Sequence, residues 1–257
     1  MKFVKSRKLN IIFTLFAVIS LCAAWIIAYY AVGNDYVIPS FGDTFASLFE
    51  CFTEASFWLA FLNTVLRTVV AFLISFALAL VSAVLSKLNF AARAFINPVI
   101  VLLRTLPTLA VILVLLIWSN AKIAPVIVTV LVLFPLLHTQ ILTSADGVDC
   151  ELCDMLKAYN VPYLRRIIKV YVPLISSDVL PQIGANLSLG LKVMISAEVL
   201  SNTYSSLGGL MQTARAYLEM PRLAALTLTV IFIGLLIDLI FSLVAKINAQ
   251  WQRGTND

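Results

Sequence analysis

The chain has 257 residues, of which 61% are hydrophobic and 12% charged, and its mean hydropathy is +1.00. Soluble domains carry roughly 45–50% apolar and about 25% charged residues, so the composition excludes a water-soluble enzyme domain, a disordered chain and a disulfide scaffold. The net charge is +5, and the basic residues lie mostly at the ends of apolar runs. That placement favours membrane topology over nucleic-acid binding.

Six apolar runs are long enough to cross a bilayer, whose ~30 Å core needs about 20 helical residues. They cover residues 11–32, 57–85, 95–118, 123–143, 174–200 and 223–245. The first run is longer than the ~7–15-residue apolar region of a signal peptide, so we expect it to be a retained anchor helix. The predicted fold class is all-α: a single polytopic membrane domain over residues 1–257 with about six transmembrane helices.

The distribution of Lys and Arg predicts the orientation. With the N-terminus in the cytoplasm, twelve basic residues fall in inner segments and three in outer segments. Cytoplasmic segments carry an excess of Lys and Arg, so both termini are expected in the cytoplasm. The outer segment 33–56 fits this arrangement, because it contains four acidic residues and no basic one. We therefore expect a multi-pass protein of the plasma membrane.

A cytoplasmic loop of about thirty residues, 144–173, separates the fourth and fifth spans. Asp149 is suited to begin a short helix in it, and Pro162 prevents the helix from continuing. Four large side chains recur at helical spacing on one face: Leu152, Met155, Leu156 and Tyr159. This amphipathic helix either lies flat on anionic lipid or docks into a groove of a cytosolic partner.

At this loop the sequence resembles the integral-membrane permease subunit of binding-protein-dependent ATP-binding-cassette (ABC) importers. That family carries the signature E-A-A-x-x-x-G, followed by an I-x-L-P-like element. The corresponding positions here are Asp154, Met155, Leu156 and Asn160, then Ile-Ile-Lys-Val-Tyr-Val-Pro at 167–173. Asn replaces the signature glycine and tolerates the left-handed turn that glycine would make.

Other stretches resemble the nitrate/sulfonate/taurine-type branch of the same family, and together they cover most of the chain. They are Ile-Pro-Ser at 38–40, Asn-Thr-Val-Leu-Arg at 63–67, Leu-Arg-Thr-Leu-Pro-Thr-Leu-Ala at 103–110, Lys-Val-Met-Ile-Ser-Ala-Glu-Val-Leu at 192–200, Leu-Gly-Gly at 207–209, Ala-Arg-Ala-Tyr-Leu-Glu at 214–219, and Asp238. Their order and spacing carry the resemblance rather than any single piece.

The resemblance implies a pathway-forming subunit that pairs with a second permease subunit, expected to be another copy of itself. It would work with separate ABC ATPase subunits and an extracytoplasmic substrate-binding protein. Its implied solute is a small nitrate-, sulfonate- or taurine-like anion, or a thiamine-precursor pyrimidine or vitamin-like compound. The expected ATPase contacts are Glu151, Leu152, Asp154, Met155, Leu156, Tyr159 and Asn160, and the candidate pathway residues are Lys192, Ser196 and Glu198.

No G-x-x-x-x-G-K-[ST] phosphate loop occurs in the chain. ATP and Mg are therefore expected on the ATPase partner, with no cofactor, metal or catalytic residue here. A membrane-embedded enzyme is a weaker alternative, because one histidine and scattered carboxylates do not form a catalytic group. An ATPase-independent secondary transporter is another, but such proteins usually contain inverted repeats, and no internal symmetry is visible.

The sequence also predicts roles for several charged, proline and small residues within the spans. Arg67 and Arg104 are expected to serve the scaffold, and Lys192 either faces the pathway or pairs with Asp178 or a backbone carbonyl. Pro98 and Pro107 are expected to kink the third span. The remaining expectations concern packing: Gly184 and Ser188 as a close helix seam between or within subunits, and His138 as a buried hydrogen-bonding residue.

Overall fold

The computed structural model describes residues 7–148, 155, 158–159, 162–166, 169–170 and 172–254, and the secondary structure in them is helical. The helices are α1 (Arg7–Val32), α2 (Phe41–Thr53), α3 (Ala55–Leu88), α4 (Phe90–Thr105), α5 (Thr108–Trp118), α6 (Ala124–Asp146), α8 (Tyr163–Arg166), α9 (Val172–Ser201), α10 (Leu207–Ala216) and α11 (Met220–Gly254). The all-α prediction is confirmed.

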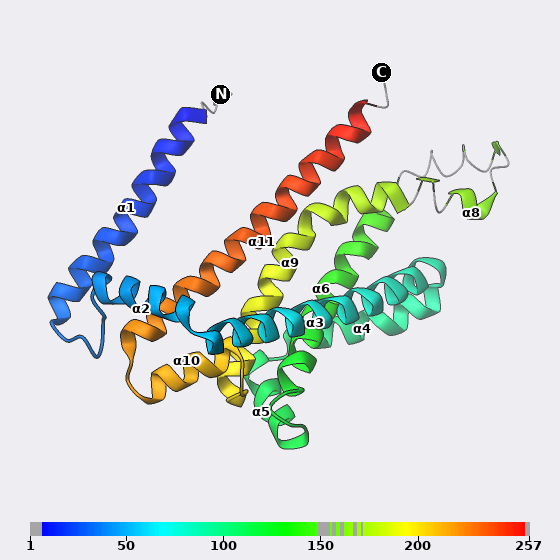
Figure 1. Cartoon of the computed structure of the whole chain (residues 1–257). Helices are drawn as coiled ribbons and strands as arrows, with labels where there is room; N and C mark the ends of the chain where they lie inside the picture. The colour runs from blue at the N-terminus through cyan, green and yellow to red at the C-terminus, as the bar shows by residue number, and fades with distance from the viewer. Residues whose placement is uncertain are drawn as a thin grey trace.

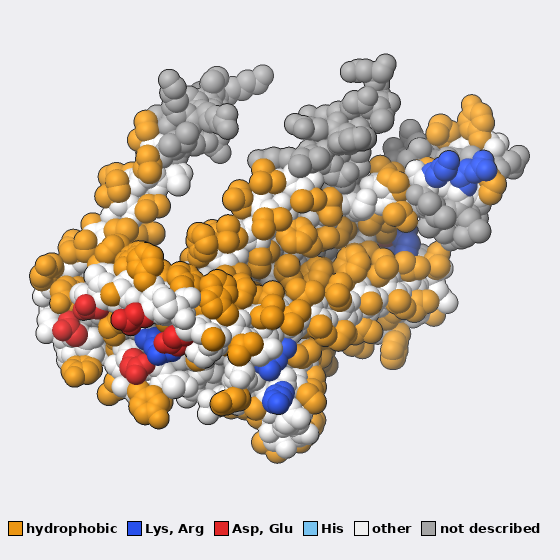
Figure 2. All heavy atoms as spheres, in the orientation of Figure 1, with side chains coloured by type: hydrophobic (Ala, Val, Ile, Leu, Met, Phe, Trp, Pro, Cys, Tyr) orange, Lys and Arg blue, Asp and Glu red, His pale blue; other side chains and the backbone are white. Residues whose placement is uncertain are grey.

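Five of these helices, α1, α3, α6, α9 and α11, are long and apolar enough to cross a membrane, and α4 with α5 supplies a sixth if the pair counts as one span. The N-terminal end of α1, the C-terminal end of α11 and α8 lie at one end of the molecule, while α2 and α10 lie toward the other (Figure 1). Apolar side chains cover most of the face between these ends (Figure 2). The exterior is thus suited to lipid.

The predicted third span is not a continuous helix. α4 and α5 meet at an angle of 96°. Leu106 takes an extended conformation (ψ 128°) and Pro107 follows it, so the helix ends there. Proline lacks an N–H and disfavours the helical conformation of the residue before it. Pro98, by contrast, lies inside α4 without ending the helix.

An amphipathic helix, α2, lies within the segment 33–56, for which no helix is predicted from the sequence. Ser40 begins it: the Ser40 hydroxyl accepts a hydrogen bond from the backbone N–H of Asp43 at 3.0 Å. Such a cap satisfies one of the free N–H groups at a helix start. α2 packs against α11 and buries Cys51, and burial raises the pKa of the Cys51 thiol. Acidic side chains gather on the face shown over α2 (Figure 2).

The main core lies where α6 passes between α3 and α9. Leu133 and Leu137 of α6 have no solvent exposure and belong to one cluster with residues of both neighbours. Two polar contacts cross the same interfaces. The His138 Nδ1 lies 2.8 Å from the Ser82 hydroxyl, and the side chains of Gln140 and Asn186 exchange hydrogen bonds of 2.6 and 3.3 Å. His138 is therefore a buried hydrogen-bonding residue, as predicted, and such bonds help to hold helices together in lipid.

The predicted small-residue seam lies within the chain, between α9 and α11. A Cβ added to Gly184 would lie 2.7 Å from the Cβ of Phe241. Ser188 is 3% exposed, and its hydroxyl donates to the carbonyl of Gly234 at 3.5 Å. Of the two alternatives that the sequence left open, the structure favours a seam inside the bundle.

Substitution at this seam should destabilise the bundle. Gly184→Val adds a side chain where Phe241 already sits, and overpacking of this kind typically costs about 1–3 kcal/mol. We expect a lower midpoint of thermal unfolding for the purified protein in detergent. Ala185→Val is the matched control, because Ala185 is the next residue of the same helix and is exposed. Equal midpoints for the two variants would contradict the seam.

Candidate functional site

One face of α9 is exposed along its length. The residues on it recur at alternating spacings of four and three, which is the helical period. They are Asp178, Gln182, Ala185, Leu189, Lys192 and Ser196, and we call them the α9 stripe. Between them lie buried residues such as Leu191 and Met194. The bundle therefore covers one side of α9 and leaves the other open.

Lys192 places a charge on this open face at membrane depth. Within the described residues Lys192 forms no ion pair. Asp178 lies 14 positions earlier, about 21 Å along a helix axis at 1.5 Å per residue, so the two side chains cannot pair within α9. The hydroxyl of Ser196 donates to the backbone carbonyl of Lys192 at 2.9 Å. This contact does not involve the ammonium group of Lys192, so it does not compensate the charge. Such a charge is costly in lipid and is expected to face a watery cavity or a protein partner.

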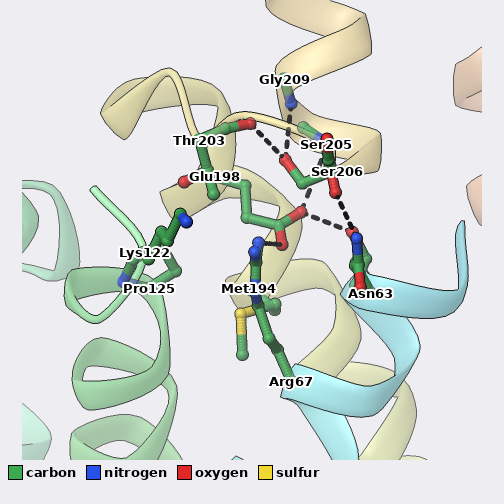
Figure 3. A network of polar contacts seen from close by, with 12 residues as sticks. Asn63, Arg67, Lys122, Pro125, Met194, Glu198, Thr203, Ser205, Ser206 and Gly209 are labelled. Atoms are coloured by element: carbon green, nitrogen blue, oxygen red, sulfur yellow. Dashed lines mark hydrogen bonds and ion pairs between the residues drawn. The ribbon is translucent and has the colours of Figure 1, made fainter. Parts of the chain in front are cut away.

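Glu198 lies on the other side of α9, at about 200° from Ser196 around the helix. Its side chain has no solvent exposure. The Thr64 hydroxyl donates to its Oε2 at 2.8 Å, and the Arg67 guanidinium donates to its Oε1 at 3.1 Å (Figure 3). The backbone N–H of Gly208 donates to Oε2 at 3.3 Å. Glu198 therefore joins α3, α9 and α10 inside the bundle, and its place among the candidate pathway residues stays a prediction.

The two glycines that begin α10 explain the Leu-Gly-Gly stretch at 207–209. A Cβ on Gly208 would lie 2.7 Å from the backbone nitrogen of Val199 and would collide with the Glu198 side chain. A Cβ on Gly209 would collide with the carbonyl of Thr203. The start of α10 thus packs backbone to backbone against the end of α9, and this approach lets the Gly208 N–H reach Glu198.

The turn between α9 and α10 is tied to two other parts of the bundle. The Asn63 amide of α3 donates to the carbonyl of Ser205 at 3.1 Å (Figure 3). The Thr203 hydroxyl donates to the carbonyl of Ala121, in the connection between α5 and α6, at 2.7 Å. Asn202 and Ser205 take left-handed backbone conformations, with φ of 49° and 51°, which turn the chain sharply. This end of the bundle is held by polar contacts as well as by packing.

The two arginines within the predicted spans differ in their contacts and exposure. Arg67 serves the scaffold through Glu198, as expected, and its side chain is 20% exposed. Arg104 is exposed in the last turn of α4, beside the bend at Pro107. The sequence marked both as family signature positions without distinguishing them.

Two of the seven predicted ATPase contacts fall within the described residues. Met155 is 49% and Tyr159 78% exposed, and the Tyr159 N–H donates to the Met155 carbonyl at 3.0 Å, as in a helical turn. The other five lie outside the described residues: Glu151, Leu152, Asp154, Leu156 and Asn160. In the described part of the chain no three His, Cys, Asp or Glu side chains are placed to hold a metal ion, and Cys150 and Cys153 lie outside it.

Residues 75–254 match the sequence profile of the family described as binding-protein-dependent transport system inner membrane component. The chain belongs to this family. It is therefore the transmembrane permease subunit of an ABC importer and a multi-pass protein of the inner membrane. A search of curated protein sequences gives no match to this permease.

Solved structures agree with the family on the fold. A chain of an amino acid ABC transporter, crystallised with histidines, superposes with a TM-score of 0.59 at 16% identity, over 76% of this permease and 91% of that chain. A chain of the MetNI methionine ABC transporter, in its inward-facing conformations, gives a TM-score of 0.60 at 13% identity, over 76% of this permease and 99% of that chain. At these identities the likeness shows the fold.

Breaking the pair of Arg67 and Glu198 should destabilise the permease. Glu198→Gln leaves the arginine without its counter-ion, and losing one partner of a buried pair typically costs about 3–5 kcal/mol. We expect a clear fall in the thermal midpoint for Glu198→Gln and for Arg67→Gln. The double variant should lose less than the sum of both, because residues in contact are not additive. Strict additivity would contradict a direct pair.

Proposed function

We propose that two copies of this permease enclose a pathway for a small polar solute, driven by separate ATPase subunits that bind ATP and Mg. The α9 stripe is the observation that carries this proposal. A lysine at membrane depth is stable only beside water or another protein, and the stripe is the face of α9 that the bundle leaves open. Paired across two copies, the stripes would line one polar pathway.

The partners and the domain organisation follow from the same reasoning. The chain contains no phosphate loop, so hydrolysis belongs to another subunit. An extracytoplasmic binding protein would supply the solute at the end formed by α2 and α10. We treat residues 1–257 as one permease domain, whose loop 144–173 contacts the ATPase.

We further propose that both termini and this loop lie in the cytoplasm. The excess of Lys and Arg in the inner segments supports this orientation. The shared placement of the α1 start, the α11 end and α8 at one end of the molecule is consistent with it (Figure 1).

For the solute, we propose a nitrate-, sulfonate- or taurine-like anion. The resemblance of segments such as 63–67 and 192–200 to that branch supports it, and the ammonium group of Lys192 suits an anion. The two structural relatives are an amino acid and a methionine transporter, so zwitterions are one alternative to assay. The resemblance to the same branch adds thiamine-precursor pyrimidines and vitamin-like compounds as another. A secondary transporter would take up the solute without the ATPase. Uptake in proteoliposomes that lack the ATPase would therefore indicate this alternative.

Lys192 provides the direct test of the pathway. In proteoliposomes with ATPase and binding protein, Lys192→Gln should raise the KM for uptake about tenfold, because a hydrogen bond to a charged group contributes about 1.5–3 kcal/mol. Lys192→Arg is the matched control, since it keeps the charge and should stay near the wild type. An unchanged KM in an assembled Lys192→Gln complex would exclude Lys192 from the pathway.

Met155 tests the contact with the ATPase. Burying a methionine contributes about 1.5–3 kcal/mol, and Met155→Asp would replace that contact with a desolvated charge. Stimulation of ATP hydrolysis by loaded binding protein should be lost while the permease still inserts. Lys157→Ala, on the opposite face by helical spacing, is the control and should behave as wild type. Normal stimulation in Met155→Asp would favour the lipid-surface alternative.

A further inference from the structure

Three helix ends meet at one carboxylate on the side of the bundle that carries the loop. Asp146 is the last residue of α6. Its Oδ1 lies 2.8 Å from the Lys87 Nζ, and its Oδ2 lies 2.8 Å from the Arg93 Nη2. The Arg93 Nη1 also reaches Oδ1 at 3.5 Å. Lys87 lies in the last turn of α3 and Arg93 in the first turn of α4. The Asp146 side chain therefore joins α3, α4 and α6.

The position of Asp146 is unfavourable without these two cations. The C-terminal end of a helix carries a partial negative charge, which repels a carboxylate. The neighbouring residues hold the three ends close: Asn89 alone connects α3 to α4, and its side chain accepts from the N–H groups of Ala91 and Ala92. The Gly147 N–H donates to the Thr143 carbonyl at 2.9 Å at the end of α6, so this helix extends three residues into the predicted loop 144–173.

Stability does not account for this arrangement. The three side chains are 33–45% exposed, and water and salt screen exposed ion pairs so that they contribute little to folding. The apolar cluster that includes Leu133 and Leu137 already packs α6 against α3. What the ion pairs add is a fixed position of the α6 end relative to the turn between α3 and α4.

We propose that Asp146, Lys87 and Arg93 form a joint that passes movement of the loop following α6 to the α3–α4 hairpin. This proposal rests on the proposed function, in which the ATPase contacts that loop and drives transport. The hairpin continues into α5, whose Ile112 packs against Ala197 of α9, beside Ser196 of the α9 stripe. The joint is thus linked along α4 and α5 to a helix contact beside the α9 stripe, and these three are positioning residues for transport.

The test compares coupling with assembly. In proteoliposomes holding the complete complex, ATP hydrolysis is measured with and without loaded binding protein, and solute uptake is measured in parallel. Asp146→Asn keeps the shape of the side chain and removes its charge. We expect the stimulation ratio to fall at least about fivefold, the lower end of typical coupling between sites, with the thermal midpoint nearly unchanged. Asp146→Glu should recover part of the ratio.

A matched control lies at the opposite end of the bundle. Glu54 pairs with Arg222 at 2.6 Å, and their side chains are 36% and 32% exposed, close to those of the joint. Glu54→Gln removes an ion pair of the same kind, so its thermal midpoint should change as little as that of Asp146→Asn. A clearly larger fall of the midpoint in Asp146→Asn, or a normal stimulation ratio in Asp146→Asn, would overturn the proposal.

A second variant covers the case in which Asp146→Asn does not assemble. Lys87→Gln with Arg93→Gln removes the charges from the other side of the joint and should lower the ratio to the same extent. A normal ratio there, or failure of both variants to assemble, would overturn the joint. An unstimulated wild-type complex would instead count against the proposed function itself.

Discussion

A carboxylate with no solvent exposure in a membrane-embedded helix is the constraint on which the α10 end of this permease depends. Glu198 is stable there only because donors from elsewhere in the chain reach it: the Thr64 hydroxyl, the Arg67 guanidinium and the Gly208 N–H. The last of these requires α10 to pack directly on α9, which only glycine allows at that position. One buried charge thereby determines how three helices meet.

The same constraint divides α9 into two faces. Glu198, Ser188 and Gly184 turn toward α3, α10 and α11, so the opposite face presents Lys192 and Ser196. Glu198 and Lys192 therefore have different environments and different tasks. The carboxylate is satisfied inside the bundle and holds it together, whereas the ammonium is left for whatever covers the open face, which we propose is the solute pathway.

The two ends of the bundle are held by different kinds of interaction. At the end with α10 the ion pair is buried and hydrogen-bonded, and separating it would expose a charge to a poorly solvating interior. At the end with the loop, Asp146 and its two cations remain partly exposed, and water can replace a broken contact there at small cost. The first interaction therefore contributes to the stability of the bundle, and the second contributes to the placement of the α6 end.

Composition, hydropathy and family signatures were enough to predict an all-helical membrane permease, its six apolar runs and the burial of His138. A Ser at 40 followed by an Asp at 43 is also typical of a helix start, and this pair marks the start of α2. Tertiary structure alone decided that Pro107 breaks its span while Pro98 does not, that Gly184 faces α11, and that Glu198 is buried between α3, α9 and α10. The physical reason is that hydropathy and helical period are local properties of the chain. The direction in which Glu198 points depends on Thr64 and Arg67, which lie 134 and 131 residues away and become neighbours only when the helices pack.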